Sequence, residues 1–446
     1  MNLSALLAAR AAQGRPVRIG LIGAGKFGSM ILAQARHIEG YHVVGIADLD
    51  VGKARDALTR VHWEAERFGA KSLADACKTG TTHVTDTAAD LFAFDDIEVI
   101  IEATGHPIAG IRHALAAIDA GKHVVMVNVE ADVLCGPLLA EKARAAGVVY
   151  SMAYGDQPAA ICELVDWVHA CGFELIAAGK GMNFAPPYRY STPDTVWDFF
   201  GWSEEEVAAG DFNPKMYNSF TDGTKAAIEM AAVANATGLD CPEDGLAFHP
   251  AGLQDLANVF RPSSDGGQLE KPGLVDIAAS REKDGRVVLN NIQWGMFVTF
   301  RAPNAYSRDC IRQYGLLTDT SGWYGSMWRP FHLIGLETSV SVLSAVLRGE
   351  ATGSSTRYRA DAVATAKGDF AAGDMLDGEG GFKVWAKAIP ARLAAAQDAL
   401  PIGLAHHIRL KRAVKRDQVI TLDDVEITDD ADIFAMREDQ KRILDG

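Results

Sequence analysis

The stretch Val17-Arg-Ile-Gly-Leu-Ile-Gly-Ala-Gly-Lys-Phe-Gly28 decides the fold of the N-terminal part of the chain. Its first six residues form a short apolar run bounded by glycine, as expected for a strand buried on both faces of a sheet. The pattern Gly23-Ala-Gly25-Lys-Phe-Gly28 follows, and helix-like apolar spacing continues through Met30, Ile31 and Ala35. A glycine-rich turn between strand and helix lets a pyrophosphate approach the helix N-terminus. The stretch predicts dinucleotide binding; the alternative is a glycine-rich turn in another doubly wound sheet.

Strands and helices alternate after this turn. Apolar runs predict further strands at Val43–Ala47, Val99–Ile101, His123–Val127 and Val148–Met152, and a helix at Ile111–Ala120 that closes at Gly121. Such alternation favours a parallel sheet with helices on both faces. We therefore expect an α/β fold that begins with a Rossmann-type, doubly wound domain over residues 1–157.

Asp48 lies at the end of the second predicted strand, about twenty residues beyond Gly28, where a ribose-binding acid is expected. A carboxylate there favours NAD, whereas Lys26, Lys53 and Arg55 either offset its repulsion of a 2′-phosphate or belong to a solvated helix face. These residues leave NAD against NADP open. The small residues after Glu102 suit the nicotinamide side. The predicted cofactor-binding residues are Gly23, Ala24, Gly25, Lys26, Phe27, Gly28, Asp48, Thr104, Gly105 and Asn128.

The composition excludes several classes of protein. The 446 residues carry a net charge of −15, with 48% hydrophobic and 23% charged residues, which is typical of a globular chain of two to four domains. The acidic balance argues against a nucleic-acid-binding protein, and no apolar run is long enough to cross a membrane. Six scattered cysteines without a CxxC pair predict reduced, mostly buried thiols in the cytoplasm.

A second domain is expected over residues 158–347, after the turn Gly155-Asp-Gln-Pro158. Helical spacing covers Ala159–Ala170, a strand is expected at Phe173–Ala178, and Thr221-Asp-Gly-Thr-Lys225 starts an Ala-rich helix to about Thr237. Asp or Thr at its start can simply cap this helix. Its charged residues are Asp222, Lys225 and Glu229, which line a substrate cleft or, in the case of the last two, form an ion pair one turn apart.

Further strands are expected at Val287–Leu289, Ile292–Trp294 and Phe297–Phe300, and a helix at Phe331–Leu347. Arginine forks suit phosphate, but solvated arginines on a sheet edge are the alternative. The arginines and aromatic residues concerned are Arg308, Arg312, Trp323, Tyr324, Trp328, Arg329 and His332. Residues 348–446, rich in turn residues and short apolar runs, predict a small β-rich domain.

The chain resembles the homoserine-dehydrogenase-like oxidoreductases, and within them the deoxyxylulose-phosphate reductoisomerase-like (DRL) family. The resemblance is carried by Ile22-Gly-Ala-Gly-Lys-Phe-Gly28, Gly179-Lys-Gly-Met-Asn183 and Met327-Trp-Arg-Pro-Phe-His332. The stretch Lys415-Arg-Asp-Gln-Val-Ile-Thr-Leu-Asp-Asp424 is similar to a SAF (antifreeze-like) domain. The resemblance implies three-domain subunits in a homodimer, with an α+β domain for catalysis and dimerisation.

The resemblance also implies an activity: NADPH-dependent conversion of 1-deoxy-D-xylulose 5-phosphate to 2-C-methyl-D-erythritol 4-phosphate in isoprenoid synthesis (the MEP pathway), inhibited by fosmidomycin. Rearrangement needs a base and an electrophile. The expected catalytic residues are Lys225, Asp222, Lys180, Glu229 and His332, the last being equally well a structural histidine. The expected substrate-binding residues are Asp156, Gln157, Asn183, Arg189, Arg312, Trp328 and Arg329. Asp156, Glu130, Asp222 and Glu229 are the candidate oxygen ligands for Mg²⁺ or Mn²⁺.

One departure concerns homoserine chemistry. Homoserine dehydrogenases carry an Asn-Lys pair after the strand that matches His123–Val127, whereas this chain has Asn128-Val-Glu130. A dehydrogenase acting on another small hydroxy or keto substrate remains the alternative enzyme. A nucleotide sensor is the non-enzymatic alternative, which the charged residues of the second domain disfavour.

Overall fold

The computed structural model describes residues 2–209 and 212–444, which pack into two compact units. The first unit comprises Met1–Ala160 with His332–Thr356, and the second comprises Ile161–Phe331 with Arg357–Gly446. The first thus takes in a segment from late in the sequence. The three domains expected from the sequence, 1–157, 158–347 and 348–446, stay a prediction beside this division.

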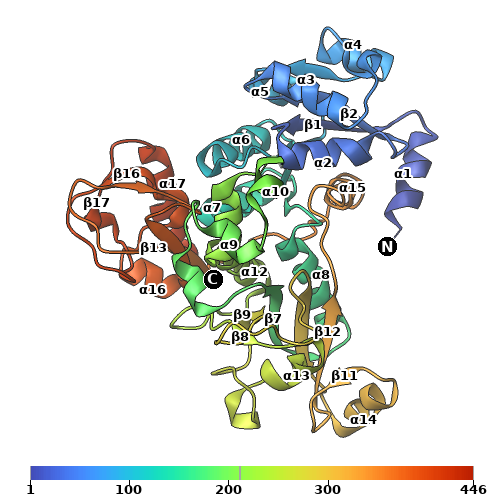
Figure 1. The fold of residues 1–446 in the computed structure, drawn as a ribbon. Helices are drawn as coiled ribbons and strands as arrows, with labels where there is room; N and C mark the ends of the chain where they lie inside the picture. The colour runs from blue at the N-terminus through green and yellow to red at the C-terminus, as the bar shows by residue number, and fades with distance from the viewer. Residues whose placement is uncertain (1, 210–211, 445–446) are drawn as a thin grey trace. The chain divides into compact units, whose positions relative to one another are not determined.

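The first unit is built on a six-stranded parallel sheet with the strand order β3-β2-β1-β4-β5-β6. Its strands β1 and β2 can be followed in Figure 1, beside helices α2 and α3. Its strands are β1 (Val17–Ile22), β2 (Tyr41–Ala47), β3 (His83–Thr85), β4 (Val99–Glu102), β5 (His123–Met126) and β6 (Tyr150–Met152). Its helices are α1 (Leu3–Ala11), α2 (Lys26–Ala35), α3 (Val51–Arg60), α4 (Leu73–Thr79), α5 (Ala88–Ala93), α6 (Pro107–Asp119), α7 (Val129–Ala145) and α15 (Ser339–Arg348). This order confirms the predicted doubly wound sheet.

Helix α15 belongs to the core of the first unit although it follows the second unit's sheet in sequence. It packs against α1 and against β4, β5 and β6. The hydroxyl of Ser341 accepts from the Tyr154 amide at 2.7 Å, and the Met152 amide donates to the Gly353 carbonyl at 2.8 Å. The helix begins at Ser339 rather than at Phe331 as predicted, because the Glu337 side chain accepts from the Leu333 amide in a preceding turn.

The second unit contains a mixed six-stranded sheet with the order β11-β12-β10-β7-β9-β8. Its strands are β7 (Glu174–Met182), β8 (His249–Pro250), β9 (Leu274–Ala279), β10 (Met296–Arg301), β11 (Leu317–Thr318) and β12 (Tyr324–Arg329). Its helices are α9 (Val196–Phe200), α10 (Glu204–Ala209), α11 (Pro214–Thr221), α12 (Thr224–Thr237), α13 (Leu256–Val259) and α14 (Ala305–Gln313), and α8 (Gln157–Ala170) leads into it. The predicted helix starting near Thr221 is thus α12.

The strands predicted at Val287–Leu289 and Ile292–Trp294 are absent from this sheet. Val287, Leu289 and Trp294 are exposed, and Asn290 has a φ of 50°. The turn residues between the short apolar runs break the pairing that the apolar pattern suggested.

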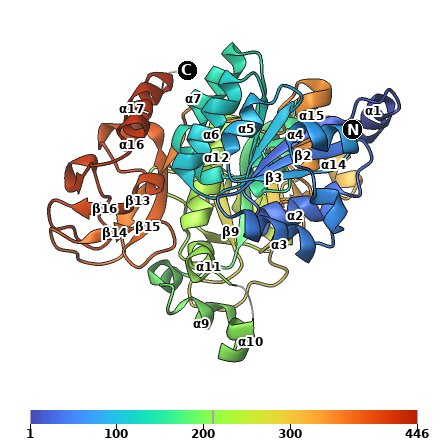
Figure 2. The same cartoon turned by 90° about the horizontal axis from the view of Figure 1, so that it is seen from above.

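The chain after residue 357 forms a β-rich segment that packs on α12 (Figure 2). Its strands are β13 (Ala360–Ala366), β14 (Met375–Asp377), β15 (Val384–Pro390), β16 (His406–Leu410) and β17 (Val425–Glu426), with helices α16 (Ala391–Ala396) and α17 (Ala431–Gln440). Strands β13 and β15 pair with each other, and α12 lies against both. The expected β-rich character is confirmed, whereas the likeness to a SAF domain stays a prediction.

Two other expectations meet the structure here. Of the six cysteines, Cys135 and Cys241 are buried while Cys171 is exposed, so the expectation that most are buried is wrong. No helix among residues 2–209 and 212–444 combines the length and the apolar character that crossing a membrane requires.

Asp276 of β9 provides a test of the buried electrostatics. One carboxylate oxygen accepts from the amides of Ala247, Phe248 and Ile277, and the other lies 3.5 Å from His249 Nε2. Burial nevertheless raises the pKa of Asp276 from 3.8 to about 7. The folded state therefore holds this proton across a range in which the unfolded chain has released it.

We predict that the free energy of unfolding falls by up to about 4 kcal/mol as the pH rises from about 4 to about 7, because the stabilising effect of this proton is lost over that range. The Asp276→Asn variant loses this part of the pH dependence, because an amide does not titrate. Urea unfolding at pH 5 and pH 8 measures the effect, with the exposed Asp284→Asn as control. An equal stability difference between wild type and Asp276→Asn at both pH values would contradict the prediction.

Candidate functional site

The glycine-rich turn between β1 and α2 has the geometry that a pyrophosphate requires. Gly23 has a φ of 93°, which favours glycine, and a Cβ on Gly28 would lie 2.2 Å from the Gly23 carbonyl oxygen. A Cβ on Gly25, by contrast, would meet no described atom within 4 Å. Gly23 and Gly28 thus shape the turn, and Gly25 leaves its outer side open to a ligand.

Asp48 contacts the same turn. Its carboxylate accepts from the Ala24 amide at 2.8 Å and from the Asp50 amide at 3.0 Å. The predicted ribose-binding acid therefore also holds the turn in place. Phe27 packs against the core of the unit, whereas Lys26 is exposed at the start of α2. These residues fit a dinucleotide, and the placing of its pyrophosphate at Gly25 and its ribose near Asp48 stays a prediction.

A buried carboxylate that sequence reasoning passed over lies at the end of β4. Glu102 accepts from Thr104 Oγ1 at 2.5 Å and lies 3.2 Å from His113 Nδ1. Gly105 follows with a φ of 71°, and Asn128 caps α7 by accepting from the Ala131 amide at 3.2 Å. The predicted cofactor residues Thr104 and Asn128 thus hold the ends of β4 and β5 in a fixed conformation.

A pair of opposite charges is buried in the second unit. Lys180 of β7 donates to Glu229 of α12, and these side chains are 10% and 5% exposed. Lys225, one turn earlier on the same helix, is half-buried. The structure therefore brings three predicted catalytic residues to one strand and one helix, and it pairs Glu229 with Lys180.

Asp222 precedes α12 and is completely buried. One oxygen accepts from the Thr224 amide at 2.8 Å, as the capping alternative anticipated, and the other lies 2.8 Å from Lys367 Nζ. Lys367 follows β13 and also donates to the carbonyls of Ser191 and Gly381, both at 2.7 Å. The C-terminal segment thus supplies the counter-ion of a predicted catalytic residue. In the sequence, only the apolar run of β13 just before Lys367 could have indicated that this lysine is buried.

The predicted substrate-binding residues lie in several places. Arg189, in the 3-10 helix Pro186–Tyr190, packs against aromatic rings beside α12, and Asn183 accepts from Arg281 at 2.7 Å. Arg312 ends α14, which packs beside β11, and Trp328 and Arg329 end β12 at the same edge of the sheet. In the first unit, Asp156 is buried with Gln157 at the start of α8, and His332 begins the returning segment. Arg189 is therefore the predicted phosphate ligand that lies beside α12.

The described residues contain no group of three or more His, Cys, Asp and Glu side chains that could hold a metal ion. Asp222 and Glu229, two of the four candidate ligands, each contact a lysine. Because each of these two carboxylates is paired with a lysine ammonium, neither is arranged as a metal ligand in this structure.

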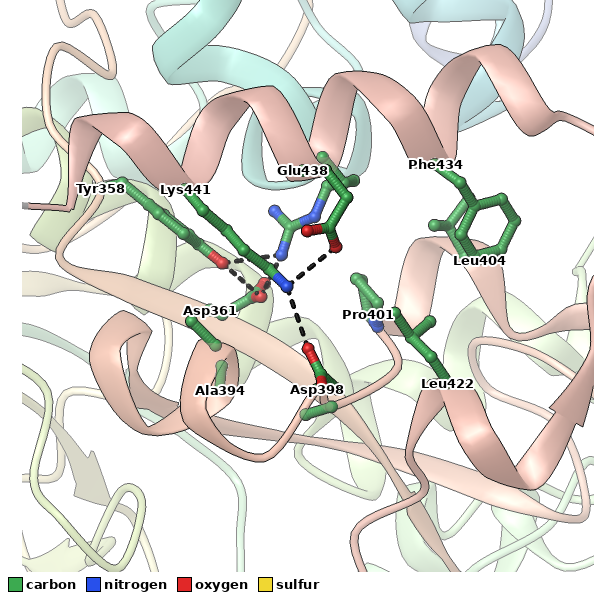
Figure 3. A pocket seen from close by; sticks show the side chains of 13 residues that line it. Tyr358, Asp361, Ala394, Asp398, Pro401, Leu404, Leu422, Phe434, Glu438 and Lys441 are labelled. Carbon is green, nitrogen blue, oxygen red and sulfur yellow. Dashed lines mark hydrogen bonds and ion pairs between the residues drawn. The ribbon is translucent and has the colours of Figure 1, made fainter.

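A pocket in the C-terminal segment is lined by charges that neutralise one another (Figure 3). Arg437 pairs with Asp361 and donates to Tyr358, and Lys441 pairs with Asp398 and Glu438. These pairs fasten α17 to β13, and the residue after α17 to the turn that follows α16. The pocket therefore fits a structural role for the C-terminal helix.

Two parts of the chain match models of known protein families. Residues 20–152 match the family model "Homoserine dehydrogenase, NAD binding domain", and residues 155–338 match "Oxidoreductase DRL, catalytic domain". The two matches support an NAD(P)-dependent oxidoreductase with a nucleotide-binding part similar to that of homoserine dehydrogenases and a following part similar to the DRL catalytic domain. No curated protein matches the chain.

The chain is also similar to solved structures, each covered only in part. For myo-inositol dehydrogenase from Lactobacillus casei the identity is 18%, with 41% of this chain and 50% of that chain covered and a TM-score of 0.27. For homoserine dehydrogenase from Thiobacillus denitrificans the identity is 20%, with 50% of this chain and 49% of that chain covered and a TM-score of 0.36. For 1-deoxy-D-xylulose 5-phosphate reductoisomerase from Zymomonas mobilis in complex with NADPH the identity is 18%, with 49% of this chain and 57% of that chain covered and a TM-score of 0.33. The chain thus spans about half the length of each.

The two glycines at positions 25 and 28 should respond differently to an added methyl group. Gly25→Ala is expected to fold as the wild type but to bind the nicotinamide nucleotide at least about tenfold more weakly, because the methyl group occupies the pyrophosphate side. Gly28→Ala should instead lower the melting temperature, because its Cβ meets backbone. Fluorescence titration with NADPH and thermal unfolding separate the two effects. Equal cofactor affinity of Gly25→Ala and wild type would show the turn is not the nucleotide site.

The buried pair Lys180–Glu229 should cost stability when one partner is removed. Lys180→Met leaves the Glu229 carboxylate buried without its cation and should destabilise the fold by about 3–5 kcal/mol. Adding Glu229→Gln should restore part of that loss, since no charge remains. Denaturant unfolding measures both, with the exposed Arg286→Met as a control that leaves stability unchanged. A double variant no more stable than Lys180→Met would contradict this account.

Proposed function

We propose that the protein is an NADPH-dependent reductoisomerase that converts 1-deoxy-D-xylulose 5-phosphate to 2-C-methyl-D-erythritol 4-phosphate. The observation that carries the proposal is the match of residues 155–338 to the DRL catalytic domain, together with the charged residues of β7 and α12 inside it. A homodimer is proposed on the resemblance to the DRL family, and a cytoplasmic location on the scattered cysteines without a CxxC pair.

The second unit offers the groups that the rearrangement requires. Carbon–carbon cleavage and re-formation need a base for a substrate hydroxyl proton and a donor for the carbonyl oxygen. Glu229 is the proposed base, and Lys225 and Lys180 are the proposed donors, all on β7 and α12. Arg189 is the proposed ligand of the substrate phosphate. NADPH, bound at the Gly23–Gly28 turn, would supply the hydride that reduces the aldehyde intermediate formed by the rearrangement.

A dehydrogenase acting on another small hydroxy or keto substrate is the second candidate. The match of residues 20–152 to the homoserine dehydrogenase NAD-binding domain favours it. Homoserine itself is a poor choice of substrate, because Val129 stands where homoserine dehydrogenases carry lysine and Asn128 serves as a helix cap.

The proposal predicts oxidation of NADPH by the purified protein in the presence of 1-deoxy-D-xylulose 5-phosphate, stopped by fosmidomycin. The assay is run with NADPH and with NADH, and with and without Mg²⁺ or Mn²⁺. It thereby tests which nucleotide the enzyme uses and whether it needs a metal ion. Mass spectrometry of the product identifies the rearranged skeleton. Absence of turnover in every condition, from protein that still binds NADPH, would favour the second candidate.

Lys225→Ala should lower kcat at least about a hundredfold, because it removes a donor to the reacting oxygen, while NADPH affinity stays unchanged. Stopped-flow reduction and NADPH titration give the two quantities. Lys271→Ala, which changes an exposed lysine of the same unit, is the matched control. Full activity of Lys225→Ala would remove this lysine from the mechanism.

A further inference from the structure

The guanidinium group of Arg189 lies over three aromatic rings. Its Cζ atom is 4.1 Å from the ring centroid of Trp385, 5.5 Å from that of Phe184 and 5.6 Å from that of Phe248. Burial lowers the pKa of Arg189, although a guanidinium stays charged in proteins. The three rings surround part of the cation, and the N–H groups of the guanidinium are what it can offer to a ligand.

These N–H donors have no hydrogen-bond or ion-pair partner among residues 2–209 and 212–444. The carboxylates whose charges act on Arg189 are already engaged. Asp222 pairs with Lys367, and Asp417 accepts from the Tyr190 hydroxyl at 3.0 and 2.9 Å. A partly buried arginine without a carboxylate partner can bind an oxyanion with two hydrogen bonds from its fork.

Trp385, in β15, has a second uncommitted donor. Its side chain is 5% exposed, and the indole N–H is buried without an acceptor in the described chain. Buried donors in folded proteins are nearly always satisfied. Because Trp385 and Arg189 contact each other, the indole N–H and the arginine fork are hydrogen-bond donors that one phosphate or carboxylate group could accept from.

The C-terminal segment also holds this cluster in position. The Ala386 amide, next to Trp385, donates to Thr224 Oγ1 at 2.9 Å at the start of α12. On the other side, the Arg416 guanidinium lies 3.6 Å from the ring centroid of Tyr190, the neighbour of Arg189. The backbone next to Trp385 and the neighbour of Arg189 are therefore both held by contacts of residues after position 357.

We propose that Arg189 and Trp385 form one oxyanion subsite, and that the C-terminal β-rich segment is part of the substrate site through Trp385. Trp385 acts as a positioning residue: it orients the Arg189 fork and adds one N–H donor. The assignment of the oxyanion as a substrate phosphate rests on the proposed function; the pairing of these two residues around an oxyanion does not.

The test is calorimetric titration of the NADPH-saturated protein, so that the nucleotide site is filled, with glycerol 3-phosphate as a phosphate monoester and lactate as a carboxylate. We expect glycerol 3-phosphate to bind, about tenfold more weakly to Arg189→Lys and Trp385→Leu, and about threefold more weakly to Trp385→Phe, which keeps a ring but loses the N–H. Trp323→Phe is the matched control, because Trp323 lies under Arg301 and Arg308 in the same unit. It should bind as the wild type does.

A double variant decides whether Trp385 acts through Arg189. If its ring acts through Arg189, Arg189→Lys combined with Trp385→Leu should bind about threefold more weakly than Arg189→Lys alone, which is the loss of the indole N–H, whereas independent residues would give a further loss of about tenfold. In the turnover assay Trp385→Phe should raise KM and leave kcat unchanged, a split that a general loss of folding would not produce. If Trp385→Leu does not fold, Trp385→Phe decides on its own.

Three outcomes overturn the inference: no anion binds to the wild type, both Trp385 variants bind as the wild type does, or Trp323→Phe loses as much affinity as Trp385→Phe. Binding of lactate instead of glycerol 3-phosphate, with the same dependence on Arg189 and Trp385, supports the subsite and contradicts the reductoisomerase. Phosphate binding that depends on both residues, without turnover of 1-deoxy-D-xylulose 5-phosphate, likewise supports the subsite while the proposed function fails.

Discussion

A single buried ammonium group holds the second unit together around its charged residues. Lys367, with a side chain only 4% exposed, donates to two carbonyl groups and pairs with Asp222. The carbonyls belong to Ser191, just after the helix that carries Arg189, and to Gly381, just before β15. Removing an ammonium from water is expensive, and three acceptors are what make the position tenable. This one cation links the start of α12, the end of the Arg189 loop and the turn before β15.

The parallel strands of the first unit and its glycine-rich turn could largely be predicted from local patterns, whereas β3, several helices and the return of α15 could not. The strand Val17–Ile22 has the bounds that its apolar run indicated, and the turn after it has glycine where a positive φ or a close approach demands one. A central parallel strand is buried on both faces, and the short-range sequence records this as an uninterrupted apolar run. The predicted role of Asp48 followed from spacing, whereas its bond to the Ala24 amide did not, because spacing does not tell where a carboxylate points.

The second unit yielded less, for a physical reason. Lys180 and Glu229 were both chosen as site residues, but their pairing joins a strand to a helix 49 positions later and competes with the local pairing of Lys225 and Glu229. The contacts of Lys367 with Ser191 and of Trp385 with Arg189 join still more distant positions. Long-range pairs of this kind leave no periodic signal. The missing strands near Val287 and Leu289 are the converse case, because a local apolar pattern there lacked any partner strand.

The return of the chain to the nucleotide-binding unit has a consequence for synthesis. Residues 1–160 leave the ribosome long before residues 332–356, so the nucleotide sheet must wait for α15, with Val342 and Leu343, to cover its apolar surface. The first unit emerges first and is completed late, while the sheet of the second unit is made in between. A newborn chain therefore carries an uncovered apolar face of the nucleotide sheet while residues 161–331 are being synthesised.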